Sequence, residues 1–379
     1  MAEIYDIAVV GAGIAGASAA AECAALGART ILIEAESQPG YHSTGRSAAI
    51  LAQSYGNPVV RALTRASEDF FTHTPDGFTP RPLLSPRKLI RIARADQMES
   101  LRALFEELSV AYDLQWLAPE QIEEIAPILR KGYAAGGFIN ARAQDIDVHA
   151  LHHGYLSMFK AHGGVIMLKA AVHNLRPGPP WEISSGGNVL QANTVINAAG
   201  AWAENLGALA GARAIGMIPK RRTAITIAAP NGFDPKDLPM IVDADEAFYL
   251  KPEAGKLLAS PADETASAPC DSQPEEIDIA ICIDRIQNAF DLDVRRVESK
   301  WAGLRSFVPD RAPVVGFDPD VAGFYWLAAQ GGYGVQTAPG LARIAATQIL
   351  NRAHHPAVQG CGLDLNDISP KRLANLQPA

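Results

Sequence analysis

The feature that most limits what this chain can fold into is an apolar run ending in the glycine pattern Gly11-x-Gly13-x-x-Gly16. An Ala-rich stretch, 15–26, comes next, and a second apolar run ends at Glu34, eighteen residues after Gly16. A buried strand, a glycine turn, a helix and an acidic residue at about this spacing form a dinucleotide-binding fingerprint. We therefore expect the chain to begin with a β-α-β unit whose first turn meets a pyrophosphate.

Each residue of the fingerprint has a separate physical role. Gly11 permits the tight turn, Gly13 lets the backbone approach the pyrophosphate, and Gly16 lets the helix pack closely on the strand. The helix N-terminus presents N–H groups and the positive end of its dipole to the phosphates. The Glu34 carboxylate would accept hydrogen bonds from ribose hydroxyls, which argues against a 2′-phosphate and so against NADP.

Composition narrows the class of protein. The 379 residues are 48% hydrophobic, enough for more than one ordinary domain. A net charge of −8 gives no support for nucleic-acid binding. The sequence contains no apolar run of about 18 residues, so no integral membrane segment is expected. Because the fingerprint starts close to Met1, we expect no signal peptide and a cytoplasmic location.

The cysteines and histidines do not indicate a metal site. Cys23, Cys270, Cys282 and Cys361 form no Cys-x-x-Cys pair. Isolated thiols without that spacing are typical of a cytosolic protein with buried or incidental cysteines. We therefore expect no bound metal.

The order of segments predicts an α/β fold with two domains. Residues 1–80, 146–215 and 305–379 are expected to form a Rossmann-like nucleotide-binding domain, and residues 81–145 and 216–304 an α+β domain built on a large, mainly antiparallel sheet. The patterns predict helices over 95–109, 118–129, 148–162 and 338–351, allow a helix to begin at Ser47, and predict strands that include 165–168, 223–228, 248–251, 256–259 and 323–328.

Three separated segments carry a resemblance to a known family. They are the fingerprint with Glu34, Asn-Ala-Ala-Gly-Ala-Trp at 197–202, and Gly-Gly-Tyr-Gly at 331–334 before a C-terminal helix. Together they resemble the FAD-dependent D-amino-acid oxidase superfamily, which includes glycine oxidase and sarcosine oxidase. Within that superfamily, bacterial D-arginine dehydrogenases are most similar, through the segments 41–49, 83–87, 219–222, 248–252, 301–307 and 330–334.

The resemblance implies FAD bound noncovalently in an extended pose. Covalent relatives attach the flavin through a cysteine near Arg305, and residues 303–307 contain none. Val172 matches a backbone contact to adenine, and the 331–336 loop would bring N–H groups to the flavin N1–C2=O edge, where they stabilise negative charge on the reduced ring. Beyond the fingerprint, the implied cofactor residues are Ile14, Ala15, Ala35, Ser43, Thr44, Arg46, Ser47, Ala48, Ala49, Val172, Ala199, Gly200, Trp202, Arg305, Gly331, Gly332, Tyr333, Gly334, Val335, Gln336 and Thr337.

The resemblance also places two arginines, Arg222 and Arg305, in a substrate site. The planar guanidinium fork suits a carboxylate because it can bind both oxygens at once. Both arginines have apolar, strand-like neighbours, where an unpaired arginine is unfavourable; a structural ion pair is the alternative role for each. Arg221 is the adjacent alternative and would point to the opposite face of a strand.

The remaining substrate contacts are implied by the same family positions. Tyr249 and Tyr55 match residues that hydrogen-bond or cover the substrate, and a purely structural role in the core is the alternative for both. Gly332 would offer its backbone carbonyl to the substrate amine, and Gln336 would support that loop. No side chain need be the essential base, because the amine can lose its proton before or during hydride transfer.

Two departures from the D-arginine dehydrogenases concern the substrate side chain. An acidic residue that grips the basic side chain is expected two places after Ser85-Pro86-Arg87, where this chain has Leu89. A histidine is expected after Ala49, where it has Ile50. An unpaired buried charge is unfavourable, so Leu89 and Ile50 predict an apolar pocket. Neutral D-amino acids, cyclic imino acids such as D-proline, and N-substituted amino acids all remain open.

These residues predict oxidative deamination of a D-amino acid, with hydride transfer from Cα to flavin N5. The product would be an imino acid, hydrolysed to a 2-oxo acid and ammonia. The alternatives are an FAD-dependent 2-hydroxy acid dehydrogenase, an N-substituted amino acid oxidase and, more distantly, a flavin-binding subunit without turnover. We expect a small amino acid as substrate and a quinone or another carrier as electron acceptor, although the sequence leaves oxygen open.

Overall fold

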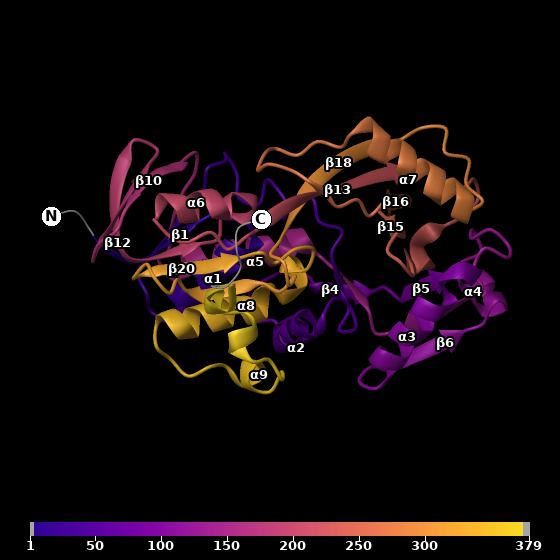
Figure 1. Ribbon diagram of the computed structural model, residues 1–379, viewed down its shortest axis with the longest axis horizontal. Helices are drawn as coiled ribbons and strands as arrows, with labels where there is room; N and C mark the ends of the chain where they lie inside the picture. The colour runs from indigo at the N-terminus through magenta and orange to yellow at the C-terminus, as the bar shows by residue number, and fades with distance from the viewer. Residues whose placement is uncertain (1–3, 374–379) are drawn as a thin grey trace.

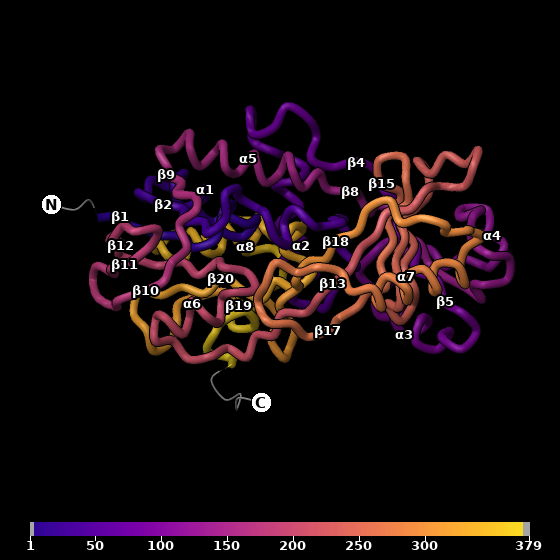
Figure 2. The backbone as a smooth tube through the Cα atoms, turned by 90° about the horizontal axis from the view of Figure 1, so that it is seen from above, coloured from indigo at the N-terminus to yellow at the C-terminus, as the bar shows by residue number. Residues whose placement is uncertain are grey.

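The strands of the computed structural model, which describes residues 4–373, form two large sheets that lie side by side (Figures 1 and 2). The first sheet has eight strands and the second has nine. A small sheet of β3 (Ile50–Leu51), β8 (Gln144–Ile146) and β4 (Leu84–Pro86) lies where the two parts meet. This confirms a mixed α/β fold with a second part built on a large sheet.

The first sheet has the parallel centre expected of a nucleotide-binding fold. Its strand order is β10-β11-β12-β1-β2-β9, with β20 on β12 and β19 on β20. The strands β20, β12, β1, β2 and β9 run parallel. The bounds are β1 (Ile4–Val10), β2 (Thr30–Ile33), β9 (Val165–Met167), β10 (Val172–Arg176), β11 (Trp181–Ser185), β12 (Asn188–Asn197), β19 (Val314–Phe317) and β20 (Phe324–Ala328).

Helices cover both faces of this sheet, which explains why its central strands are apolar throughout. On β1, Ile7 and Val9 pack against one set of helices, while Ala8 and Val10 face the other side, as the period of two requires. The first set is α1 (Ile14–Ala25), α2 (Pro58–Thr72), α5 (Val148–Ala161) and α8 (Gly334–Ile349), with α9 (Pro356–Gln359) beside α2 and α8. On the other side lies α6 (Ala203–Leu209), which shares a buried cluster with side chains of β10 and β11.

The second sheet is antiparallel except between β5 and β14. Its order is β17-β13-β16-β15-β14-β5-β7-β6, with β18 also on β13. The strands are β5 (Leu89–Ala93), β6 (Leu114–Leu117), β7 (Gly136–Asn140), β13 (Ile218–Ile227), β14 (Met240–Asp243), β15 (Tyr249–Glu253), β16 (Lys256–Ser260), β17 (Thr265–Ala266) and β18 (Ser299–Phe307); the helices are α3 (Met98–Ser109), α4 (Pro119–Ile125) and α7 (Glu276–Ala289).

Three expected boundaries were wrong, each for a local reason. No helix begins at Ser47; the chain runs extended into β3, and α2 begins at Pro58 behind the Asn57 cap. The helix expected over 118–129 ends at Ile125 because Pro127 disfavours a helical residue before it. The last helix begins at Gly334 rather than at residue 338, so Pro339 lies inside it. The Ser67 hydroxyl accepts the Gly340 N–H there, at 2.9 Å.

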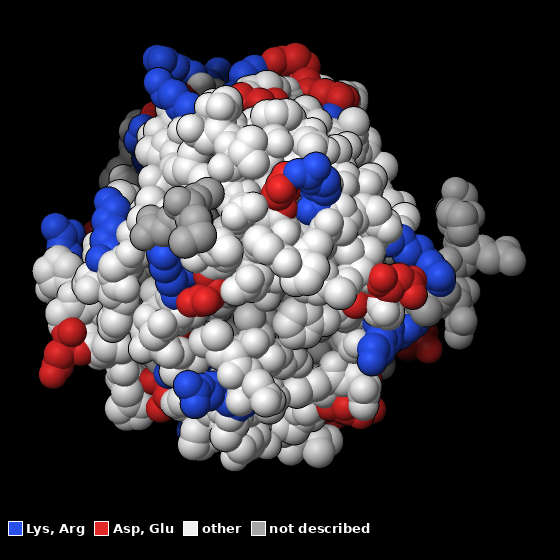
Figure 3. Space-filling view, turned by 90° about the vertical axis from the view of Figure 1, so that its left-hand side faces the viewer, with Lys and Arg blue, Asp and Glu red and all other residues white. Residues whose placement is uncertain are grey.

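The assignment of segments to two domains stays a prediction. Strand β18 runs across the expected boundary at residue 305, and the small sheet draws strands from both expected domains. No helix within residues 4–373 is long and apolar enough to cross a membrane. On the face shown in Figure 3, basic and acidic side chains are interspersed, so the described part of that face offers no broad basic surface to a nucleic acid.

Candidate active site

Three adjoining cavities run from the first sheet toward the second. The nucleotide cavity has a volume of about 370 Å³, the central cavity about 140 Å³ and the inner cavity about 40 Å³. Ser43, Thr44 and Arg46 line both the nucleotide and central cavities, and Arg222 and Arg305 line both the central and inner cavities. Because they share these lining residues, the three cavities are together called the trough.

The glycine turn at the nucleotide end is built by close backbone approaches. Gly11 has φ +101°, and a Cβ atom there would lie 2.3 Å from the Ala198 carbonyl oxygen. A Cβ atom on Gly16 would lie 1.8 Å from the Gly11 oxygen, whereas one on Gly13 would meet only the Thr44 hydroxyl, at 3.2 Å. Gly11 and Gly16 thus hold strand and helix together, and Gly13 leaves room at the cavity wall.

Glu34 presents a buried carboxylate to the nucleotide cavity. Its two oxygens accept the Ala12 N–H at 2.7 Å and the Glu36 N–H at 3.0 Å. Each oxygen keeps a further lone pair for a hydroxyl donor. At the start of α1, the Ile14 N–H is already taken by the Thr44 hydroxyl, at 2.9 Å, so this N–H is not free for a phosphate.

A second wall of the nucleotide cavity was missed by the sequence reasoning. The His42 ring packs on the predicted residue Trp202 with ring centroids 4.7 Å apart, and its Nε2 lies 2.9 Å from a Glu36 carboxylate oxygen. Its Nδ1 is buried without a partner among the described residues. An unsatisfied buried nitrogen is unfavourable, so this atom is available to a polar ligand. The sequence feature that could have indicated this wall is the aromatic pair Tyr41-His42 in a loop of otherwise mostly small residues.

Arg305 and Arg222 lie on the same side of two paired strands. Lys220 of β13 is opposite Arg305 of β18, and Arg222 is opposite Gly303, so both arginines project to one face. Arg222 donates to the Asp263 carbonyl oxygen at 2.8 Å. Within residues 4–373, the Arg305 guanidinium has no hydrogen-bond or ion-pair partner, and it faces the central and inner cavities.

Arg221 projects to the other face of β13, as the strand period predicts. Its guanidinium pairs with Asp278 at 3.0 Å and with Glu275 at 2.5 Å, both near the start of α7. This arginine is therefore fully occupied by a structural ion-pair network. Of the two adjacent arginines, only Arg222 reaches the cavities.

The inner cavity gathers most of the predicted substrate residues. Tyr55, Tyr249, Ile50, Gly332 and Gln336 all line it, together with the apolar side chains of Met240, Val242, Phe248 and Ala262. Burial raises the pKa of the Tyr55 hydroxyl. The Gln336 amide donates to the Thr64 hydroxyl at 3.0 Å, while its Oε1 atom is buried without a partner among the described residues. The cavity is thus mainly apolar, with a few polar atoms.

Four predicted residues do not line these cavities: Gly16, Leu89, Tyr333 and Thr337. Leu89 lies one layer back, buried in the cluster that contains Ile50, Met240 and Tyr249. The Tyr333 ring packs edge-on against Tyr55, and the Thr337 hydroxyl donates to the Tyr333 carbonyl within α8. The other predicted cofactor residues line at least one cavity.

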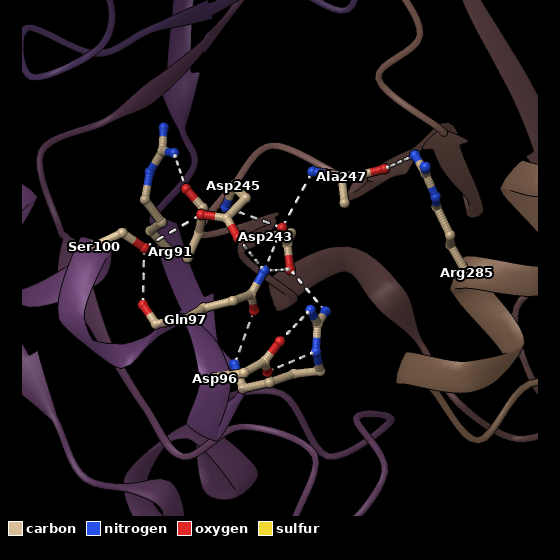
Figure 4. A network of polar contacts seen from close by, with 10 residues as sticks. Arg91, Asp96, Gln97, Ser100, Asp243, Asp245, Ala247 and Arg285 are labelled. Carbon is tan, nitrogen blue, oxygen red and sulfur yellow. Dashed lines mark hydrogen bonds and ion pairs between the residues drawn. The ribbon is translucent and has the colours of Figure 1, made fainter.

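Glu246, which the sequence reasoning also missed, lines the inner cavity from the turn between β14 and β15. A buried network holds this turn (Figure 4). The Asp243 carboxylate accepts the Gln97 amide and the Asp245 and Ala247 N–H groups, and the Arg91 guanidinium pairs with Glu246 at 3.1 Å. No local sequence pattern indicates this network, because its residues meet only once the second sheet has formed.

Glu264, which pairs with Arg222, should make the free energy of unfolding fall at acid pH. Its carboxylate bonds to Arg311 and Lys220, and these contacts lower its pKa from 4.5 to about 2. A depressed carboxyl pKa stabilises the fold above the unfolded value, and this stabilisation is lost as pH falls from about 4.5 toward 2. Thermal melting should show Glu264→Gln less stable than wild type at pH 6, with the gap closing toward pH 2. A gap that is the same at both pH values would contradict this assignment.

Comparison with known proteins places the chain in a family. Residues 6–348 match the family model DAO, described as FAD dependent oxidoreductase. The chain belongs to the DAO family. FAD is therefore its cofactor, and the trough fits it: a buried acceptor carboxylate and a glycine turn stand at the nucleotide end, and N–H groups at the start of α8 stand at the central cavity. Family membership was predicted correctly; the special closeness to D-arginine dehydrogenases stays a prediction.

Known proteins resemble this chain at low sequence identity. Mitochondrial dimethylglycine dehydrogenase of Mus musculus is 26% identical in an alignment of 258 residues that covers 62% of this chain and 29% of that protein. The chain thus spans less than a third of that relative's length. The glycine oxidase structure from Geobacillus kaustophilus covers 97% of this chain and 98% of its own, with 20% identity and a TM-score of 0.79. L-proline dehydrogenase from P. horikoshii covers 100% of both chains, with 19% identity and a TM-score of 0.80.

Proposed function

We propose that this DAO-family protein oxidises the Cα–N bond of a small neutral amino acid, with a D-amino acid as first candidate. The observation that carries the proposal is the Arg305 guanidinium, which faces the cavities and has no hydrogen-bond or ion-pair partner in the described part of the chain. Arg222 lines the same cavities. Its Nε atom donates to the Asp263 carbonyl oxygen and its Nη2 atom pairs with Glu264, which leaves Nη1 for a ligand. Two adjacent guanidinium groups repel each other unless anionic groups pair with both of them. The nearby protein carboxylates do not pair with Arg305, so an anionic ligand is expected, and a carboxylate suits the planar guanidinium fork.

The chain's own groups orient such a substrate. Arg305 and Arg222 bind its carboxylate, the Tyr249 and Tyr55 hydroxyls hydrogen-bond to it or cover it, and the Gly332 carbonyl accepts from its amine. Bound FAD supplies the two-electron oxidation of the Cα–N bond. The apolar wall excludes bulk water while the imino acid forms, and water then hydrolyses that product to a 2-oxo acid and ammonia. No carboxylate or histidine is needed as base in this scheme.

The inner cavity supports a neutral side chain. Its wall is made by Ile50, Met240 and Val242, and Leu89 adds an apolar second layer behind them. The single acid on the wall, Glu246, is already paired with Arg91. A cationic side chain would therefore lack a carboxylate partner of its own, which is unfavourable in a buried site.

Ile50→Ala tests which side chains the cavity admits. Removing the buried side chain enlarges the inner cavity, and a methylene in an apolar pocket is worth roughly 10–200-fold in discrimination. We expect kcat/KM for a branched substrate such as D-leucine to rise relative to D-alanine by about tenfold. Steady-state kinetics with both substrates measure this ratio. An unchanged ratio would show that Ile50 does not border the substrate side chain.

An N-substituted amino acid is the second candidate. It is favoured by the 26% identity to a dimethylglycine dehydrogenase, a protein whose name describes an N-methylated substrate. The same carboxylate clamp would serve it, and the apolar wall would accommodate N-alkyl groups. A 2-hydroxy acid would also fit the clamp, but it lacks the amine that the Gly332 carbonyl is proposed to bind.

The decisive experiment is anaerobic reduction of the purified holoprotein with a panel of D-, L- and N-substituted amino acids and 2-hydroxy acids. Loss of the flavin absorption band with neutral D-amino acids is the expected result. Bleaching only by N-substituted amino acids would select the second candidate, and bleaching only by hydroxy acids would overturn both. Reoxidation of the reduced protein by a soluble quinone, compared with oxygen, then tests our proposal that a carrier accepts the electrons.

A further inference from the structure

A segment of the second part of the molecule reaches back to the nucleotide cavity. Residues 267–273, here called the strap, belong to the connection between β17 and α7. Cys270 and Ser272 of the strap line the nucleotide cavity, as do Gly11 and Gly13 of the glycine turn. The cavity that receives the ADP half of FAD thus has one wall from outside the nucleotide-binding sheet.

Arg46 makes most of the side-chain contacts that hold the strap. Its Nη1 atom donates to the carbonyl oxygens of Ser272 and Ala302, both at 2.9 Å, and its Nη2 atom donates to the Asp271 carboxylate at 2.5 Å. The Tyr41 hydroxyl also donates to Asp271, at 3.2 Å, and the Arg46 guanidinium stands over the Tyr41 ring. Arg46 itself is nearly buried, with 14% of its side chain exposed.

We propose that the strap closes the nucleotide cavity over bound FAD and that Arg46 is its latch. The sequence resemblance had implied Arg46 as a direct cofactor residue, but four of its contacts are to the strap, β18 and Tyr41. Three of the five N–H donors of this guanidinium are thus engaged with protein groups, and all three point to the strap or to β18. Arg46 is therefore a positioning residue that governs how long FAD stays bound, through Asp271.

The test compares FAD release from wild-type and Asp271→Asn holoprotein. The change keeps the shape of residue 271 but removes the charge-assisted hydrogen bond to Arg46. We expect FAD to dissociate about tenfold faster from the variant. The release is measured as free FAD in ultrafiltrates taken at intervals after dilution. If Arg46 instead held the pyrophosphate, removing a competing carboxylate would strengthen that contact. Unchanged or slower release would therefore overturn the proposal. Asp293→Asn, which removes the exposed pair with Arg295 outside the cavities, is the matched control.

Cys270 supplies a second readout that needs neither substrate nor turnover. It is exposed, whereas Cys23, Cys282 and Cys361 are buried, so N-ethylmaleimide should modify Cys270 first. We expect bound FAD to slow this modification at least tenfold relative to the apoprotein, and Asp271→Asn to restore much of the rate in the holoprotein. Equal rates for wild-type apoprotein and holoprotein would contradict a closed strap. Cys270→Ser identifies the modified thiol, and intact mass counts it.

Discussion

Replacing Arg305 by alanine is expected to lower kcat/KM by about 10²–10⁴-fold while FAD remains bound, since each hydrogen bond to a charged group contributes about 1.5–3 kcal/mol and two are lost. The loss should appear mainly in KM for the carboxylate-bearing substrate, because the clamp acts before the reaction begins. The change should leave the fold intact, since Arg305 has no ion-pair partner within residues 4–373 to be left unpaired. Steady-state kinetics and the ratio of flavin to protein absorbance check both statements.

Two further variants sharpen this prediction. Arg305→Lys keeps the positive charge but loses the planar fork, so an intermediate loss of about tenfold is expected. Arg130 belongs to an exposed ion pair and lines none of the three cavities. Arg130→Ala should therefore leave kcat/KM unchanged. An Arg305→Ala variant with unchanged KM and kcat would mean that the substrate carboxylate binds elsewhere.

Gly16→Ala is expected to abolish FAD binding and to destabilise the fold by more than about 4 kcal/mol, the range reached only by severe overpacking or equivalent damage. The added Cβ atom would lie 1.8 Å from the Gly11 carbonyl oxygen. Neither partner can yield, because Gly11 is itself pressed against the Ala198 carbonyl. Helix α1 must therefore move away from β1, which opens the turn that meets the cofactor. Flavin content and chemical denaturation of the purified variant measure the two effects.

Two other Gly→Ala variants serve as controls, because they show the effect of adding a Cβ atom where there is no close backbone contact. Gly360→Ala meets only one atom, at 3.4 Å, and has a negative φ, so its stability should match that of wild type. Gly13→Ala meets the flexible Thr44 side chain at 3.2 Å, and it should fold but bind FAD more weakly. A Gly16→Ala protein that retains full flavin content and its melting temperature would disprove the close-packing role.

Local patterns predicted the parts of the molecule whose geometry repeats along the chain. The strand-turn-helix at the N-terminus follows from the spacing of three glycines. The opposite directions of Arg221 and Arg222 follow from the two-residue period of a strand, and the structure pairs Arg221 with α7 and leaves Arg222 at the cavities. Such features need no knowledge of distant segments.

The errors arose where a distant segment decides the outcome. Leu89 lies behind the cavity rather than on its wall, because β5 is buried on both sides and its apolar pattern does not say which neighbour is nearer the ligand. Helix α8 continues through Pro339, and the Gly340 N–H there donates to the Ser67 hydroxyl of α2, a partner that the local sequence does not reveal. His42 lines the nucleotide cavity beside Trp202, and Glu246 reaches the inner cavity from the β14–β15 turn, where it pairs with Arg91.

The order of strands in the first sheet also determines when this sheet can form while the chain is being synthesised. Strand β1 pairs with β2, made soon afterwards, but its other neighbour is β12, which begins at Asn188. A ribosome adding roughly 5–20 residues per second needs about 10–40 s to reach that strand. Until then the Gly11 turn lacks Ala198 beside it, and the apolar edge of β1 stays exposed. A nascent chain of this protein should therefore depend on chaperones over that interval, and it should acquire FAD only near the end of translation, once β20 and α8 have followed.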